Sequence, residues 1–384
     1  MKKPLRIGIE AQRLFRPKKH GMDIVALELI RHLQEEDLEN EYFIFVKPDE
    51  DNGVIKETPN FKIIEIEGGP YPIWEQVHLP KALKIHKIQL LHCTSNTAPL
   101  RPGVPLVITL HDIIYLEKMD LKKGTWYQRI GNLYRRWNVP KVVPNCETIL
   151  TVSEFEHKRI VDHFKLKNQD VQVVYNSVGD HFLAEADAVD LAKIKVKYEL
   201  PDKFMFFLAN TDPKKNLRGV LQALTLLHGE GKLLLPLVML DFKEEYLMEM
   251  LKEIGASDLR DMIHISGYVP NRELPFFYKL ADIYLYPSLR ESFGIPILES
   301  MACGTPVITS NTSSMPEVSG GAAILIDPFN PQSIAEAILQ LDTDTDLRED
   351  LIQKGLNRAQ RFSWANTAKQ VRGIYEEALK HTEH

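Results

Sequence analysis

Residues 289–304 read LRESFGIPILESMACG, and they lie between two apolar runs, IYLYPS (283–288) and PVITS (306–310). Proline is favoured at the first position of a helix and glycine just past its end. The stretch therefore predicts a helix that begins at or just before Pro296 and ends near Gly304. The short apolar runs on either side are typical of buried strands. The segment as a whole predicts a strand, a loop, a helix and a second strand.

The same alternation extends along the whole chain. Seven strand-like runs come first: LRIGIE, YFIFV, FKIIEI, QLLHC, PLVITL, ETILT and VQVVY. Six more begin at Phe204: FMFFLA, LPLVML, MIHIS, IYLYPS, PVITS and AAILID. Most are separated by segments with helical periodicity, among them 22–35, 153–165, 216–227, 271–281 and 331–341. Continuous apolar strands that alternate with amphipathic helices predict parallel sheets covered on both faces, an α/β doubly wound fold.

The two series of strands predict two domains. Residues 174–203 contain no strand-like run after Val174, and we interpret them as a linker with one helix. The predicted boundaries are 1–178 for the first domain and 179–363 for the second, with a cleft between them. Ligands of doubly wound sheets bind beyond the carboxyl ends of the strands, so the residues that follow each strand are the candidates for a site.

Composition excludes some classes of protein. A chain of 384 residues is long for a single core, and its net charge of −6 argues against a nucleic-acid partner. The three cysteines, Cys93, Cys146 and Cys303, are far apart in the sequence and form no zinc-binding pattern. The start of the chain lacks the apolar core of a signal peptide, and no run of 18 apolar residues occurs. We expect a cytoplasmic protein with reduced thiols.

The loop before Pro296 has the features of an anion-binding helix start. The backbone N–H groups of Phe293, Gly294 and Ile295 would point out of the helix toward a phosphate. Glu291 and Glu299 lie on either side of this start, and an ionised carboxylate only accepts hydrogen bonds. Hydroxyl groups on both sides of a diphosphate would satisfy both glutamates, as in a nucleotide sugar. From the pattern alone, an ordinary loop charge and an ordinary first-turn glutamate explain it equally well.

The segment PSLRESFGIPILESMACGTPVITSN resembles the Glu-x7-Glu signature of the retaining family-4 glycosyltransferases of GT-B fold. Resemblances elsewhere extend over nearly the whole chain: GIEAQRL, ITLHD, TVSEFE, VVYNSV, DPKKNL, ISGYV, SSMPEVSGGAAILIDP and FSWANTAKQVRGIYEEAL. The family implies two Rossmann-like domains that face each other across a cleft. The first would hold the acceptor and the second the nucleotide-diphosphate sugar, and a last helix, 364–384, would cross back onto the first.

The resemblance implies roles for residues of the second domain. Glu291 would contact hydroxyls of the donor sugar, and the backbone of 293–295 would meet the sugar and the diphosphate. Glu299 would hold the ribose hydroxyls. Lys215, in DPKKN, would neutralise the diphosphate and assist its departure, while its neighbour Lys214 fits a solvated lysine better.

The match departs from the family pattern near this lysine. Many members carry an arginine five residues before it, where this chain has Asn210. Asn210 and Thr211 can donate hydrogen bonds to phosphate, but they supply no positive charge. Tyr268 and Val269 resemble the loop that borders the nucleobase, which their backbone would contact.

Two residues of the first domain complete the implied site. His111 follows the strand PLVITL, where the family places a histidine near the donor sugar. A lone histidine is otherwise more often a buried packing residue. Gly21 lies where the loop after the first strand enters its helix, and the family keeps glycine there to let phosphate or acceptor approach.

Within the family, GIEAQRL, DPKKN and TSSMPEVSGGAA look most like mannosyltransferases of surface polysaccharide assembly that use GDP-mannose. The acceptor would be a hydroxyl of a glycan or of a lipid-linked glycan. The alternatives are a transferase that uses a UDP-sugar, a nucleotide-sugar epimerase on the same fold, and a non-catalytic subunit. The resemblance implies no cofactor and no metal, and we interpret LDTDTD (341–346) as a helix-capping loop rather than a metal site.

Residues 125–141, TWYQRIGNLYRRWNVPK, predict an amphipathic helix with basic residues. By helical spacing one stripe carries Trp126, Ile130, Leu133 and Trp137, and the basic residues around it are Arg129, Arg135, Arg136 and Lys141. Such a stripe usually packs in a core, which is the expectation we favour. The alternative is peripheral contact with an anionic membrane, at the inner face of which the protein would work.

Overall fold

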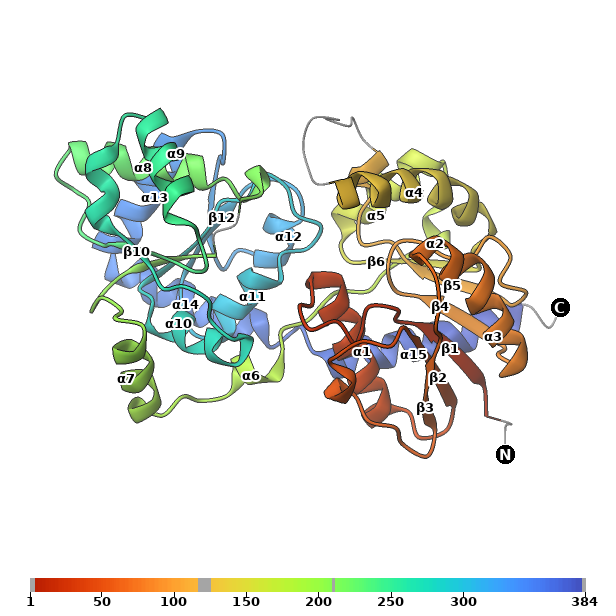
Figure 1. Ribbon diagram of the computed structural model, residues 1–384. Coiled ribbons are helices and arrows are strands. Elements are labelled where there is room, and N and C mark those ends of the chain that lie inside the picture. Colours follow the sequence, from red (N-terminus) through yellow and green to blue (C-terminus); the bar gives the residue numbers. More distant parts are fainter. Residues whose placement is uncertain (1–3, 117–125, 209–210, 382–384) are drawn as a thin grey trace. The chain divides into compact units, whose positions relative to one another are not determined.

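The computed structural model describes residues 4–116, 126–208 and 211–381, with the backbone alone at 126–129 and 381. The chain divides into two compact units (Figure 1). Unit 1 comprises Met1–Asn176 together with Trp364–His384, and unit 2 comprises Ser177–Ser363. The final helix thus belongs to the same unit as the start of the chain.

Unit 1 is built on a parallel, seven-stranded sheet in which the strand order is β3-β2-β1-β4-β5-β6-β7. The strands are rich in Ile, Leu, Val and Phe, and all except the edge strands β3 and β7 are almost wholly buried, as expected when both faces are covered. Their bounds are β1 Arg6–Glu10, β2 Glu41–Val46, β3 Phe61–Glu65, β4 Leu90–Cys93, β5 Leu106–Thr109, β6 Thr148–Thr151 and β7 Val171–Val173.

Helices cover both faces of this sheet. One face packs against α1 (Gly21–Glu36) and α15 (Trp364–His381), which contact each other. Their apolar side chains share a core with alternate strand residues such as Ile7, Ile9 and Ile44. The other face packs against the helical turn Trp74–His78, which follows α2 (Tyr71–Ile73), and against α3 (Leu79–Ile85), α4 (Trp126–Val142) and α5 (Glu154–Phe164).

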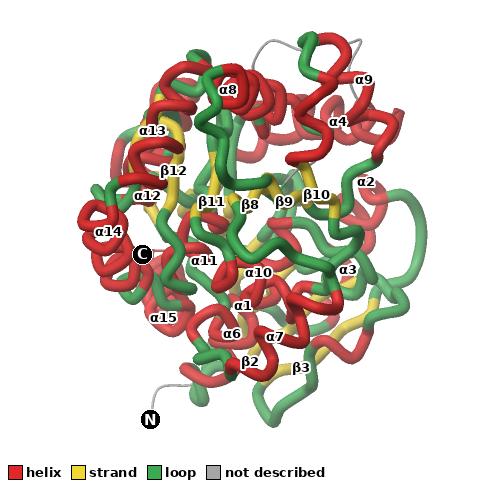
Figure 2. Tube along the Cα trace, turned by 90° about the vertical axis from the view of Figure 1, so that its left-hand side faces the viewer, coloured by secondary structure: helices red, strands yellow, loops and turns green. Residues whose placement is uncertain are grey.

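Unit 2 has a parallel, six-stranded sheet of order β10-β9-β8-β11-β12-β13, and Figure 2 shows its strands side by side. The bounds are β8 Met205–Phe207, β9 Leu237–Met239, β10 Ile263–Ile265, β11 Ile283–Tyr286, β12 Val307–Ser310 and β13 Ile324–Ile326. Helices α8 (Leu217–Gly229), α9 (Glu244–Glu253) and α13 (Pro331–Thr343) share one apolar core with the sheet. The opposite face carries an aromatic layer in which Phe206, Tyr278 and Tyr284 contact one another.

Helices α10 (Leu274–Leu280) and α11 (Ile295–Ala302) lie on this aromatic side, and α14 (Thr345–Ala359) packs on α11. The other helices of unit 2 are α6 (Asp180–Leu183), α7 (Ala188–Lys197) and α12 (Met315–Ser319). The region after Val174 therefore contains two helices where the sequence predicted one. Asp344, in the predicted capping loop, accepts a hydrogen bond from the Leu347 N–H (2.9 Å) and caps α14.

The predicted α/β fold with two parallel, doubly wound sheets is confirmed, and each predicted apolar run contains one strand. In both sheets the order reverses beside the strand that begins the unit, between β1 and β4 and between β8 and β11. Such a topological switch point is where doubly wound sheets bind ligands. Among the helices in the described ranges, none is long and apolar enough to cross a membrane.

Candidate functional site

The switch point of unit 2 brings together two residues that are far apart in sequence. Lys215 ends a short 3-10 helix in the loop after β8, and Glu291 lies in the loop after β11. The Lys215 Nζ and the Glu291 Oε1 are 2.7 Å apart, and both side chains are largely buried, at 17% and 11% exposure. The two loops are also joined through the backbone, because the Leu289 N–H donates to the Lys214 carbonyl (2.7 Å).

Tyr286, the last residue of β11, is a third member of this group. The Lys215 ammonium donates to the Tyr286 hydroxyl (3.1 Å) and lies over the tyrosine ring, 4.8 Å from its centre. An ammonium carries three N–H donors, so the contacts with Glu291 and Tyr286 leave one further donor for a ligand. The arrangement holds a cation at the carboxyl edge of the sheet.

The protonation of Glu291 is set by these neighbours. Burial acts to raise the pKa of Glu291, but the positive charges of Lys215 and Lys214 outweigh it and hold the pKa below its ordinary value. Glu291 is therefore an ionised acceptor at neutral pH.

Glu299, on α11, is in a different electrostatic state. Burial raises the pKa of Glu299 to about 7, although the hydrogen bond from the Tyr278 hydroxyl (2.9 Å) and the charge of Lys215 act to lower it. The carboxyl of Glu299 therefore holds its proton more readily than that of Glu291. The charge of Lys215 acts to lower the pKa of both glutamates, but only Glu291 is paired with it directly.

The start of α11 depends on Gly294. This residue caps the helix with a φ of 107°, which side chains with a Cβ rarely adopt, and a Cβ there would also lie 3.2 Å from Ile297. Helix α11 begins at Ile295 and is followed by Gly304 with a φ of 76°, as its sequence predicted. The first N–H groups of a helix lack partners within the helix and favour anions, so the backbone of 293–295 can receive a phosphate.

Hydroxyl side chains from β12 and the segment after it hold the loop that carries Glu291. Four of them donate to backbone carbonyls of that loop or of the last residue of β11, and we call Thr309, Ser310, Thr312 and Ser314 the hydroxyl ladder. Its bonds run from Thr309 to the Tyr286 carbonyl (2.9 Å), Ser310 to Ser288 (2.7 Å), Thr312 to Leu289 (3.3 Å), and Ser314 to Glu291 (3.0 Å) and Phe293 (2.8 Å). The ladder fixes the backbone on which both Glu291 and the helix start depend.

The other predicted donor residues of unit 2 lie along the same edge of the sheet. Thr211 is exposed and shares the β8 loop with Lys215, whereas Asn210 lies outside the described residues. Tyr268 and Val269 follow β10, and the side chain of Tyr268 is exposed. Backbone bonds from Ser266 to Met239 (3.0 Å) and from Asp241 to Gly267 (2.8 Å) join this loop to the end of β9.

His111 and Gly21 belong to unit 1. His111 is buried, its Nε2 lies 2.9 Å from the Thr94 carbonyl, and its backbone N–H donates to the Asn96 side chain (2.7 Å). Burial lowers the pKa of His111, so the ring is neutral at pH 7. A neutral ring that donates through Nε2 keeps Nδ1 as an acceptor for a hydroxyl. Gly21 is the exposed first residue of α1, and a Cβ there would meet no atom within 4 Å.

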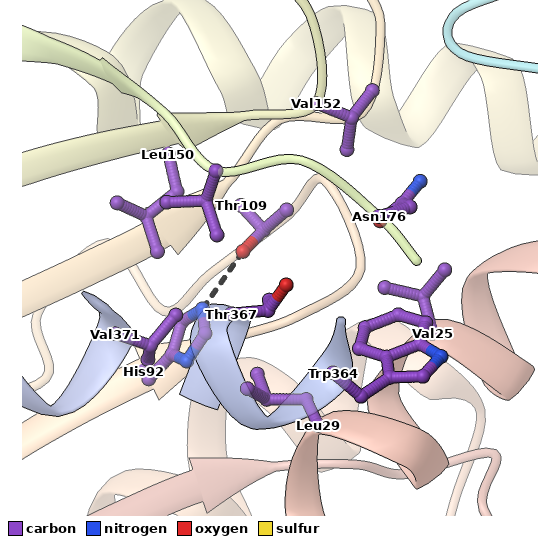
Figure 3. A pocket seen from close by; sticks show the side chains of 11 residues that line it. Val25, Leu29, His92, Thr109, Leu150, Val152, Asn176, Trp364, Thr367 and Val371 are labelled. Atoms are coloured by element: carbon purple, nitrogen blue, oxygen red, sulfur yellow. Dashed lines mark hydrogen bonds between the residues drawn. The ribbon is translucent and has the colours of Figure 1, made fainter. Parts of the chain in front are cut away.

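A separate pocket in unit 1 contains none of the predicted site residues. It lies between the sheet, α1 and α15, and Figure 3 shows Leu29, Val371 and Trp364 on its walls. Its polar side chain His92 lies within hydrogen-bond distance of Thr109 (2.8 Å) and Tyr375 (2.6 Å). Burial lowers the pKa of His92 to about 3, so His92 stays neutral. The pocket is an apolar gap in the core rather than a site for a charged ligand.

Sequence reasoning missed Tyr286, Tyr278 and the hydroxyl ladder. The one signal for the ladder was the density of hydroxyl residues in TSNTSS (309–314), and for Tyr286 its place at the end of a strand. Within the described part of the chain, no group of three or more His, Cys, Asp or Glu side chains could hold a metal ion.

Comparisons with known proteins bear on the family and the fold of this chain. Residues 190–358 match the family model "Glycosyl transferases group 1", and residues 20–181 match "Glycosyltransferase Family 4". The chain is 33% identical over 298 residues to the O-antigen chain mannosyltransferase B of Escherichia coli, a match that covers 77% of this chain and 76% of that protein.

A second relative in E. coli, the serotype-specific mannosyltransferase WbdA, is 30% identical over 229 residues. That match covers 58% of this chain and only 28% of WbdA. Among solved structures, Anabaena HepE in complex with UDP and glucose superposes with a TM-score of 0.73 at 17% identity, covering 97% of this chain and 99% of HepE, which supports the fold.

Proposed function

Because the chain belongs to the group 1 and family-4 glycosyltransferases, we propose that it moves a mannosyl residue from GDP-mannose to a hydroxyl of a growing surface polysaccharide, with retention of the anomeric configuration. The choice of mannose rests on the two relatives, whose names give them as an O-antigen chain mannosyltransferase and a serotype-specific mannosyltransferase.

One observation carries the proposal: the ion pair of Lys215 and Glu291 at the switch point of unit 2 (2.7 Å), beside the start of α11. Lys215 faces the departing diphosphate and stabilises the charge that develops on it. Glu291 stays ionised and accepts hydrogen bonds from hydroxyls of the sugar, and Glu299 accepts them from the ribose. In unit 1, the Nδ1 of His111 accepts a sugar hydroxyl.

The proposed reaction breaks the bond between the anomeric carbon and the diphosphate oxygen and forms a bond to the acceptor oxygen on the same face. The departing phosphate takes the proton of the acceptor hydroxyl, so no protein nucleophile is required. We propose that Lys215 supplies the positive charge on the leaving group and that transfer needs no divalent cation. The free state of Cys93, Cys146 and Cys303 supports placing the reaction in a reducing, cytoplasmic compartment.

The first experiment is a thermal-shift panel of GDP-, UDP- and ADP-sugars, because a ligand at 100 times its Kd stabilises the protein by about 2.7 kcal/mol. The stabilising donor is then incubated with a glycan acceptor in EDTA, and the product is analysed by mass and by NMR of the new anomeric centre. We expect a glycan longer by one hexose, with the anomeric configuration of the donor.

Glu291→Gln is the decisive variant. It keeps the shape of the side chain and removes the charge, and we expect transfer to fall about 10²- to 10³-fold, comparable to the loss of an oxyanion-hole donor. Unchanged turnover would remove Glu291 from the mechanism. Preference for a UDP-sugar would overturn the GDP-mannose assignment alone. An isomeric donor formed without acceptor would instead identify an epimerase.

A further inference from the structure

Helix α4 of unit 1 exposes apolar side chains that the sequence expectation placed in a core. Ile130 and Leu133 are each 57% exposed and Trp137 is 46% exposed. Their spacing of three and four residues puts them on one side of the helix. The expectation of core packing is therefore wrong for these three, whereas the side chain of Trp126 lies outside the described residues.

The opposite side of α4 explains why this stripe faces outward. Asn138 and Val139 are fully buried, and Asn138 exchanges hydrogen bonds with the backbone of Ala98 (2.8 and 3.2 Å). Tyr134 donates to the buried carboxylate of Glu75. Polar anchors on the inner side thus fix the rotation of the helix and leave the apolar stripe outside.

The charged residues of the helix itself have one sign. Residues 126–142 contain four basic residues and no Asp or Glu, in a chain whose net charge is −6. Lys141 continues the stripe one turn beyond Trp137, with its ammonium 4.3 Å from the centre of the Trp137 ring. Tryptophan and lysine are residues that sit well at a lipid–water boundary, since the ring tolerates both phases and the long lysine stem carries its charge to the headgroups.

We propose that the α4 face, defined as Ile130, Leu133, Trp137 and Lys141, docks on an anionic lipid surface. An apolar stripe beside basic residues on one helix fits a helix that lies in the plane of the lipid headgroups. The docked protein would receive its acceptor at the membrane surface. This last consequence rests on the proposed function, but the docking itself does not.

The test measures binding of the full chain to sedimenting vesicles of phosphatidylcholine with and without phosphatidylglycerol, in the absence of donor and acceptor. We expect binding that requires phosphatidylglycerol and weakens with salt. Replacing Ile130, Leu133 and Trp137 together by serine should reduce the partition coefficient at least about tenfold. Lys141→Glu should reduce it about fivefold or more.

Matched controls come from the same unit. Ile85 is 74% exposed at the end of α3, and Lys84 beside it is also exposed, so Ile85→Ser and Lys84→Glu should leave vesicle binding unchanged. Full binding by the triple serine variant would overturn the proposal. So would a loss of thermal stability in that variant, which would mean that part of this chain covers the stripe.

Self-association of the wild type that the triple serine variant abolishes, without vesicle binding, would also overturn the proposal and assign the α4 face to contacts between copies. Vesicle binding with no sugar transfer would count against the proposed function alone. Transfer to a soluble acceptor with no vesicle binding would count against the docking alone.

Discussion

Each unit carries a buried carboxylate beside its switch point, and the two carboxylates differ in charge. Glu291 in unit 2 is paired with Lys215, and its pKa lies below the ordinary value. Glu10, the last residue of β1, is fully buried, and its Oε2 has no hydrogen-bond partner among the residues that the structure describes. Burial, reinforced by the nearby charge of Glu75, raises the pKa of Glu10 to about 7. Burial alone therefore does not decide the charge of a carboxylate: the direct ion pair with Lys215 lowers the pKa of Glu291, whereas the charge of Arg13 does not offset burial at Glu10.

Removing the cation should make Glu291 resemble Glu10. Lys215→Met keeps the length of the side chain, and we expect turnover to fall about 10³-fold because the leaving group loses its positive partner. Unfolding free energy should also fall by about 3 kcal/mol, since the buried Glu291 is left unpaired. Kinetic assays and urea unfolding measure both effects.

The double variant Lys215→Met with Glu291→Gln should regain stability but not turnover. Lys214→Met is the control, because Lys214 is 42% exposed and lies outside the 2.7 Å pair. Wild-type turnover in Lys215→Met would contradict the role of this residue.

Removing the charge from Glu10 should change how stability depends on pH. The folded pKa of about 7 exceeds the ordinary value of 4.5, so folded protein holds an extra proton between these values and loses stability as the pH rises through them. The contribution of Glu10 to the free energy of unfolding therefore falls by about 3 kcal/mol between pH 4.5 and 7. The free energy of unfolding of Glu10→Gln, relative to that of the wild type, should therefore be higher at pH 8 than at pH 5 by about that amount.

Urea unfolding of both proteins at several pH values measures this effect. An equal difference in stability between variant and wild type at pH 5 and pH 8 would show that Glu10 does not titrate in this range.

The raised pKa of Glu299 predicts a pH-dependent donor affinity. Glu299 must be ionised to accept two ribose hydroxyls, so the Kd of the nucleotide sugar should rise about tenfold from pH 8 to pH 6, as expected for a single group with a pKa of about 7. A nucleotide sugar is the right ligand for this test because its diphosphate is esterified at both ends, so the ligand itself does not change protonation between pH 6 and 8. Calorimetric titration measures the affinity.

Glu299→Gln should abolish this dependence, whereas Glu10→Gln should keep it, although the pKa of Glu10 is also about 7. A dependence that disappears with Glu10→Gln and persists with Glu299→Gln would reverse the assignment.

The smallest expected effect concerns the tyrosine beside the ion pair. Tyr286→Phe keeps the ring below the Lys215 ammonium and removes the hydroxyl 3.1 Å from it. A hydrogen bond of a charged group is worth roughly 1.5 kcal/mol, so kcat should fall about tenfold or less while the KM of the donor changes little. If the thermal stability of Tyr286→Phe stays close to that of the wild type, the fall in kcat reflects the positioning of Lys215 rather than a role of the Tyr286 hydroxyl in packing.

Tyr246→Phe serves as the control, because Tyr246 is exposed on α9, the helix that follows β9. An unchanged kcat in Tyr286→Phe would mean that Glu291 alone positions the Lys215 ammonium.

The sequence predicted the elements of the fold well because the apolar runs and helical periods are local signals. The family resemblance assigned Lys215 and Glu291 to one donor site, in loops that follow parallel strands, but their direct ion pair was not predicted. Tyr278 and Tyr286 escaped prediction because their contacts depend on which face of the sheet a residue occupies and on the helix that packs there. The exposure of the apolar stripe of α4 was not predicted for a similar reason. Hydrogen bonds of Asn138 and Tyr134 to residues far away in sequence determine which side of the helix is buried.

The hydroxyl ladder has a consequence for engineering. The loop that carries Glu291 is held by the side chains of Thr309, Ser310 and Ser314, which lie at the end of a different strand, β12, or just after it. A chimera that imports residues 287–294 from a relative would bring the counterparts of Glu291 and Gly294 but leave the side chains that hold this loop behind. To transfer donor preference, residues 287–294 and 309–314 should therefore be exchanged together. A recombination point between these two segments would separate the loop from the side chains that hold it.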